Sequence, residues 1–154
     1  MVQPIQKTIE VPCNPETAFD ILVGKTATWW PLDRHSVSAM NGKTARSVTI
    51  EPAVGGRVYE TGAEGEIIPW GSVTVYEPGE RIVIAWHINK PEAEATEVEF
   101  RFTSAGPSST RVDLEHRGFD ASAPDAQEFR DRYANGWVTV FETCYGEGCV
   151  AEAA

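Results

Sequence analysis

The sequence predicts an α+β fold in which a curved antiparallel β-sheet wraps around a long C-terminal helix. Three observations lead to this prediction. Alternating apolar and polar residues indicate one strand near the N-terminus and six more between residues 45 and 117. Two short helical segments follow the first strand, and one long helical segment follows the last. Each later strand offers one apolar face, which the aromatic stripe of the long helix can cover.

The N-terminal part is expected to be a strand followed by two short helices. Residues 5–11 alternate between apolar and polar side chains for most of their length. Asn14 can cap a helix that ends at Gly24, and residues 26–30 can form a further helical turn. Residues 32–44 show little periodicity and are expected to form a loop.

The six later strands are separated by Gly and Pro signals. Turns are expected at residues 55–56, 62–65, 78–79 and 105–109. The strand over residues 66–77 is interrupted by Pro69 and Gly71. Such a pair inside a strand indicates a bulge or an edge position.

The last helix is expected to begin at Pro124 and to present one broad apolar stripe. The stripe, at spacings of three and four, consists of Phe129, Tyr133, Trp137, Val140, Phe141 and Cys144. Polar residues are expected away from it, namely Arg130, Asp131, Arg132, Asn135, Thr139 and Glu142. Gly136 within this helix costs about 1 kcal/mol relative to Ala unless close packing requires it.

Composition excludes several classes of function. The 154 residues carry 13 Lys and Arg against 23 Asp and Glu, a net charge of −10 that argues against nucleic-acid and anionic-membrane partners. Cys13, Cys144 and Cys149 form no C-x-x-C pair, and the three histidines lie far apart, so neither a metal nor a cofactor is expected. No signal-peptide pattern, nucleotide-binding loop or hydrolase motif is found. We expect a cytoplasmic single domain over residues 1–154.

Seven segments resemble, in order and separation, the helix-grip (START-like, SRPBCC) superfamily, and in particular its branch named after the activator of the heat-shock-protein-90 ATPase. They are VPCNPETAF at 11–19, WWP at 29–31, GGRVYE at 55–60, WGSV at 70–73, EPGERI at 77–82, TRVDLEHRG at 110–118 and NGW at 135–137. The resemblance implies a helix-grip fold with a ligand cavity between sheet and helix. The superfamily includes lipid carriers, polyketide cyclases, hormone receptors and co-chaperone domains, so the fold does not select one activity. The co-chaperone members carry an additional N-terminal domain, whereas ten residues precede the shared pattern here.

Strand alternation, together with the implied cavity, predicts which side chains line it. They are Val58, Glu60, Ile84, Trp86, Val98, Phe100, Leu114 and His116 from strands, and Phe129, Tyr133, Trp137 and Phe141 from the helix. Trp29 and Trp30 are expected to form a lid over the mouth of the cavity. The alternative for these two is an exposed hot spot for a protein partner.

Glu60 and His116 are the ionisable groups expected on this apolar surface. They could orient a polar group of the ligand, or one could act as a general base. The alternatives are a bulge that turns Glu60 outward and a His116 that simply bonds a neighbouring carbonyl.

The function expected first is binding of a small hydrophobic or amphipathic molecule. The alternative is a cofactor-independent polyketide cyclase or aromatase, with a cyclase or dehydratase type of activity. A second alternative is a protein-interaction or co-chaperone domain related to the stress response, with a protein partner or a homodimer.

Overall fold

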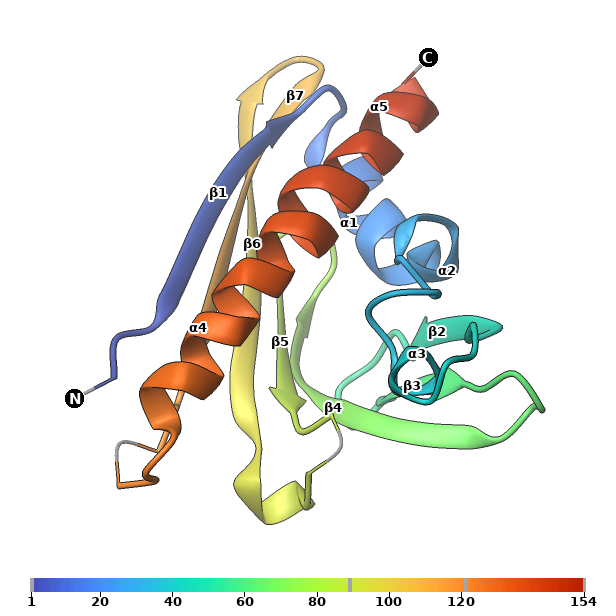
Figure 1. Ribbon diagram of the computed structural model, residues 1–154. Coiled ribbons are helices and arrows are strands. Elements are labelled where there is room, and N and C mark those ends of the chain that lie inside the picture. Colours follow the sequence, from blue (N-terminus) through green and yellow to red (C-terminus); the bar gives the residue numbers. More distant parts are fainter. Residues whose placement is uncertain (1, 89, 121, 154) are drawn as a thin grey trace.

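The computed structural model describes residues 2–88, 90–120 and 122–153. The described residues contain seven strands, several short helices and a long C-terminal helix (Figure 1). In chain order they are β1 (Ile5–Val11), α1 (Pro15–Gly24), α2 (Thr26–Trp29), α3 (Val37–Met40), β2 (Ser47–Ile50), β3 (Arg57–Thr61), β4 (Ile67–Glu77), β5 (Arg81–Trp86), the 3₁₀ turn η1 (Glu92–Glu94), β6 (Thr96–Gly106), β7 (Ser109–Arg117), α4 (Ala126–Trp137), the π-helical η2 (Val138–Tyr145) and α5 (Gly146–Ala153).

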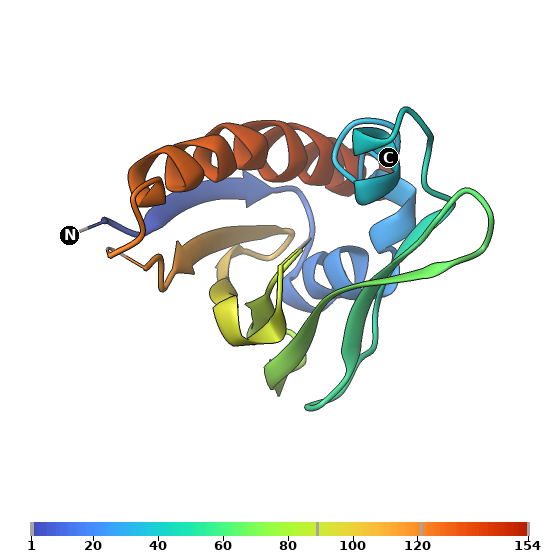
Figure 2. The same ribbon diagram turned by 60° about the horizontal axis from the view of Figure 1, so that its bottom comes forward.

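The strands form one antiparallel sheet in the order β1-β7-β6-β5-β4-β3-β2. The sheet curls, and α4, η2 and α5 run as one continuous helix across its concave side (Figure 2). The predicted α+β helix-grip fold is therefore confirmed. In the part of the chain that the structure describes, no helix is both long and apolar enough to cross a membrane.

The segment expected to be a loop contains a further helix. Residues 32–44 include α3, whose first turn is capped by Ser36, which accepts a hydrogen bond from the Ala39 backbone N–H at 3.0 Å. The prediction missed α3 because a helix of one turn is too short to show a period. By contrast, α1 begins as predicted, with the Asn14 side chain accepting from the Thr17 N–H at 2.9 Å.

The expected bulge is present in β4. Val58 pairs with Gly71 and Tyr59 with Pro69, so Trp70 is the additional residue on this strand. The bulge points the Trp70 side chain into the core, where it is fully buried. Its carbonyl accepts from the His87 N–H at 2.7 Å, which ties β4 to the end of β5.

The C-terminal helix differs from the predicted α-helical stripe in its second half. Tyr145 and Cys149 are fully buried, whereas Cys144 is only half-buried. The cause is the π-helical stretch η2, in which the Gly146 N–H bonds to the Phe141 carbonyl five residues earlier. This wider winding shifts the core-facing positions away from those expected for an α-helix.

Tryptophan rings fill much of the space between sheet and helix. Trp30, Trp70, Trp86 and Trp137 form a chain of contacts, with ring centroids 5.0 Å apart for Trp30 and Trp70, 5.7 Å for Trp70 and Trp86, and 5.6 Å for Trp86 and Trp137. Such tilted and edge-to-face pairs add to the hydrophobic stabilisation of their burial.

Gly71 offers a test of this packing. A Cβ at this position would overlap the Ala85 carbonyl on β5, so Gly71→Ala should lower the free energy of unfolding by about 1–3 kcal/mol in urea denaturation. Gly106→Ala is the matched control, because its Cβ would meet only the Ser109 Cβ at 3.7 Å. Equal stabilities of the two variants would contradict this account of the β4–β5 contact.

Candidate functional site

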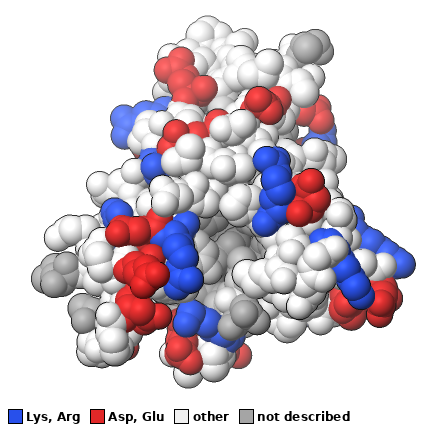
Figure 3. Space-filling view, in the orientation of Figure 1, with Lys and Arg blue, Asp and Glu red and all other residues white. Residues whose placement is uncertain are grey.

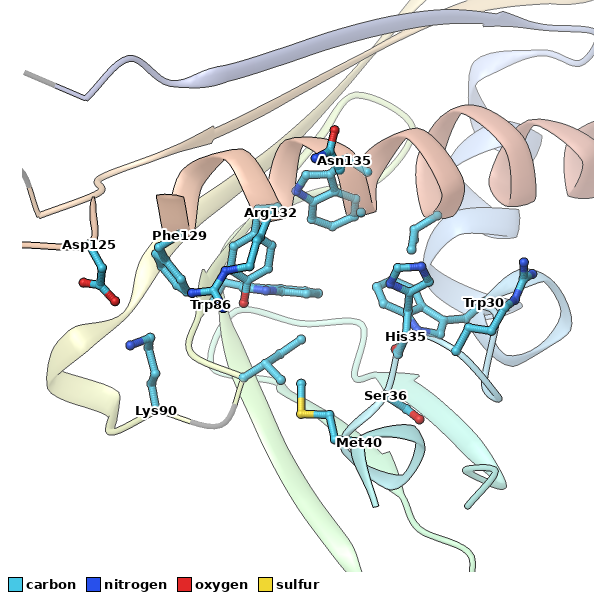
Figure 4. A pocket seen from close by; sticks show the side chains of 16 residues that line it. Trp30, His35, Ser36, Met40, Trp86, Lys90, Asp125, Phe129, Arg132 and Asn135 are labelled. Carbon is cyan, nitrogen blue, oxygen red and sulfur yellow. Dashed lines mark hydrogen bonds between the residues drawn. The ribbon is translucent and has the colours of Figure 1, made fainter. Parts of the chain in front are cut away.

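A pocket of about 600 Å³ opens at one end of the helix-grip core. Its walls come from α4, from the end of β5 and the residues after it, and from the segment of residues 30–40 (Figure 4). In Figure 3 it is a hollow near the middle of the face, with basic side chains at its margin. The volume lies in the usual range for small-molecule sites.

The lining combines aromatic walls with a polar rim. Its apolar members are Trp30, Met40, Trp86, Ile88, Phe129, Tyr133, Trp137 and Val140, and the others are Arg34, His35, Ser36, Lys90, Asp125, Arg132, Asn135 and Gly136. A ligand here would meet rings along its body and charged groups at its edge.

Only some of the predicted lining residues lie on this pocket. Trp86, Phe129, Tyr133 and Trp137 do. The other apolar ones are buried in the hydrophobic core, namely Val58, Ile84, Val98, Phe100, Leu114 and Phe141. The space beside Val58, Ile84 and Phe100 is a void of only about 10 Å³. The pocket thus occupies one end of the space between sheet and helix where the cavity was expected, and buried side chains fill the space beside the other predicted lining residues.

The two tryptophans expected to form a lid are both buried and have different surroundings. Trp30 lies on the pocket and donates its indole N–H to the His35 carbonyl at 2.6 Å. Trp29 packs edge-on against Tyr145 and donates to the Ile21 carbonyl at 2.8 Å. With exposed fractions of 8% and 9%, they do not form the exposed pair that the alternative required.

Glu60 points inward and is fully buried, so the outward-turning alternative is wrong. Its carboxylate accepts from the backbone N–H groups of Val37 and Ser38 at 2.7 and 2.9 Å, and from the Ser38 hydroxyl at 2.5 Å. The indole N–H of Trp70 is a fourth donor at 3.1 Å. All of these partners are structural, and Glu60 is not part of the pocket lining.

His116 is also fully buried and belongs to a chain of hydrogen bonds within the core. Its Nδ1 accepts from the Trp137 indole N–H at 3.1 Å, which places the proton of the neutral ring on Nε2. Nε2 can then donate to the Thr96 hydroxyl at 2.7 Å, and that hydroxyl donates to the Trp86 carbonyl at 3.3 Å. Burial lowers the pKa of His116 to about 3.

The structure does not bring Glu60 and His116 together as a polar pair on the pocket. Glu60 binds the segment that contains α3, while His116 joins β6 and β7 to the helix. Because the partner of Nδ1 is an indole, which only donates, a protonated His116 would lose this bond. Neither residue offers a free basic atom toward the pocket.

Two features of the pocket carry chemistry, and both belong to aromatic side chains with a polar group. The Trp86 indole N–H is buried and has no hydrogen-bond partner among the described residues. Burial raises the pKa of Tyr133 above its usual value, against smaller opposing effects of the Trp86 N–H and the Arg132 charge. The aromatic spacing suggested these residues as lining, but their mutual position depends on the fold.

The remaining pocket residues were missed for identifiable reasons. Arg34, His35 and Met40 come from the segment without periodicity, and Arg132 and Asn135 were expected on the opposite side of the helix from the stripe. The sequence did offer one signal for the pocket at Gly136, because a glycine inside a helix destabilises it and is expected only where packing or function requires it. The nearest atom to an added Cβ there is His35 Cε1 at 3.8 Å, so close packing is not that reason.

The sequence model of a family described as "Activator of Hsp90 ATPase homolog 1-like protein" matches residues 12–143. The comparison with curated proteins gives no significant match. Among solved structures, the chain is similar to the self-sacrificing resistance protein CalC from Micromonospora echinospora, with a TM-score of 0.70, 25% identity, and coverage of 98% of this chain and 96% of that one.

Two further structures share the fold at lower identity. An HSP90 activator from Plasmodium falciparum gives a TM-score of 0.60 at 23% identity over 90% of both chains. The anthrahydroquino-γ-pyrone synthase Txn09 gives 0.61 at 22% identity over 96% of this chain and 97% of that one. A resistance protein, an activator and a synthase therefore use similar folds.

The buried His116 predicts acid sensitivity. Its pKa is about 3 in the folded state against 6.5 normally, so below pH 6.5 the unfolded chain binds a proton that the folded chain does not. His116 therefore does not lower the free energy of unfolding above pH 6.5. As the pH falls from 6.5 toward 3, the free energy of unfolding declines by up to about 1.4 kcal/mol per pH unit.

His116→Gln should flatten this decline, since Gln can accept from Trp137 and donate to Thr96 but does not titrate. Urea denaturation between pH 7 and 4 would measure it. The other two histidines are present in both proteins, so the difference between the profiles isolates His116. Parallel profiles would contradict the prediction.

Proposed function

The chain belongs to the family of activator of Hsp90 ATPase homolog 1-like proteins, and we propose that it binds a small amphipathic molecule in the pocket beside α4. The observation that carries the proposal is an open space of about 600 Å³ with aromatic walls, left in a core that is otherwise filled. The family and the shared fold do not choose between binding, catalysis and protein interaction. The pocket favours binding.

The aromatic walls of the pocket suit a ligand with a flat, apolar part. Trp30, Trp86 and Trp137 approach one another with centroids 5.6–6.3 Å apart, and they line the pocket together with Phe129 and Tyr133. Rings in such positions bind apolar and aromatic ligands at low entropic cost, because packing already holds them in place. The charged rim would remain in contact with water and with the polar end of the ligand.

The alternatives have less support. The acid–base pair suggested for a cyclase, Glu60 and His116, is absent from the pocket lining, so that hypothesis has no catalytic residues of its own here. The protein-partner hypothesis required Trp29 and Trp30 to be exposed, and both are buried. A homodimer, a co-chaperone role and a cytoplasmic location remain predictions from the sequence.

Gly136 allows the pocket to be blocked without destabilising the protein. Leu is a better helix former than Gly by up to about 1 kcal/mol, so Gly136→Leu should not lower the free energy of unfolding, while its side chain fills space between α4 and His35. Titration with the neutral fluorophore N-phenyl-1-naphthylamine should give saturable binding to the wild type. In the variant we expect affinity to fall at least tenfold.

Gly136→Ala is the matched control. Its Cβ would meet His35 at 3.8 Å, an ordinary contact, so the variant should gain helix stability and still bind the fluorophore. Absence of binding to the wild type, or equal binding by the Leu variant, would refute the proposed site.

A further inference from the structure

We infer that the molecule bound in this pocket is an aromatic carboxylate, whose anionic group is held by Arg132, Trp86 and Tyr133. This inference rests on the proposed function and specifies the chemical class of the ligand. It follows from three polar side chains that line the pocket, one of which presents a buried indole N–H without a hydrogen-bond partner among the described residues.

The first donor is the indole N–H of Trp86. The side chain is 4% exposed and lines the pocket, yet its Nε1 has no partner among the described residues. A buried donor without an acceptor costs about 1–3 kcal/mol, and an indole nitrogen cannot act as an acceptor instead. An acceptor atom supplied by a ligand would remove this penalty.

The second donor is the phenol of Tyr133, the residue that follows Arg132 on α4. Tyr133 lines the same pocket, and its hydroxyl can both donate and accept a hydrogen bond. The Trp86 N–H and the Arg132 charge are both near enough to this phenol to lower its pKa, in opposition to the larger effect of burial. Trp86, Arg132 and Tyr133 all line this pocket.

The third donor supplies the charge. In Figure 4 the guanidinium of Arg132 extends from α4 in the direction of Trp86. Of the basic residues in the lining, Arg34 is paired with Asp33 at 3.6 Å and Lys90 with Glu94 at 3.9 Å, whereas Arg132 makes no ion pair with any described residue. A guanidinium presents two parallel N–H groups that match the two oxygens of a carboxylate.

The charge of the pocket is opposite to that of the whole chain. Its lining contains three basic side chains and one carboxylate, that of Asp125, in a chain with a net charge of −10. If charged residues were placed at random in a chain of this composition, carboxylates would outnumber basic side chains in the lining. Because the donors lie beside the rings of Trp86 and Phe129, the anionic group is expected to be attached directly to an aromatic system.

Matched acid and amide pairs test the inference. 2-Naphthoic acid and 2-naphthamide have nearly the same shape and differ in charge at pH 7.5, and the corresponding benzene and anthracene pairs extend the size range. By isothermal titration calorimetry we expect the wild type to bind at least one acid tenfold or more tightly than its amide. This ratio is typical for a hydrogen-bonded ion pair that is partly shielded from water.

Two charge-removing variants locate the preference. Arg132→Gln should reduce affinity for the acid about tenfold and change that for the amide less than twofold. Arg46→Gln removes the same charge from an exposed position beside Gly65, outside the pocket lining, and should leave both affinities unchanged. This pattern would support the inference.

The failures of the two proposals can be told apart. If acid and amide bind equally, or if the preference survives in Arg132→Gln, the anionic inference is wrong and the proposed function stands. The same holds if no pair binds but the neutral fluorophore does. If neither the pairs nor the fluorophore bind the wild type, both proposals fail.

Discussion

The buried carboxylate of Glu60 is the interaction on which the pocket end of the molecule depends. A carboxylate removed from water must be compensated by hydrogen-bond donors, and here four donors surround it, from Val37, Ser38 and Trp70. These donors connect β3 with the bulge of β4 and with the start of α3. These hydrogen bonds anchor Val37 and Ser38, in the segment of residues 30–40 that forms one wall of the pocket.

The same arrangement explains why the core is filled at one end and open at the other. The bulge that directs Trp70 toward Glu60 also brings its ring against Trp30 and Trp86. Trp137 completes the cluster from the helix and is fixed by His116. At the pocket end, α4 has a glycine at position 136, which faces His35 and carries no side chain to fill the space there.

Sequence periodicity predicted the strands, the first helix and the long helix, because burial of one face imposes a regular spacing on the chain. The alternation placed Glu60 and His116 on the inward face, with an outward-turning bulge as the alternative for Glu60, and both side chains are fully buried. It could not supply their partners, because Val37, Ser38 and Thr96 are distant in sequence and their positions depend on tertiary packing. The pocket was predicted only through its aromatic residues. Its charged members come from the aperiodic segment, or from a helix position such as Arg132 that an apolar stripe does not include.

The π-helical stretch has a consequence for how a single helix can follow a curved sheet along its whole length. Six residues at a constant spacing of four, Phe129, Tyr133, Trp137, Phe141, Tyr145 and Cys149, lie on the pocket or in the core. In an α-helix with 3.6 residues per turn, such a row drifts around the axis by about 40° at every step. The wider turns of η2 rotate the row in the opposite direction, so that its later members again face the core. One local change of winding thus allows the same helix to contribute pocket residues at its beginning and core residues at its end.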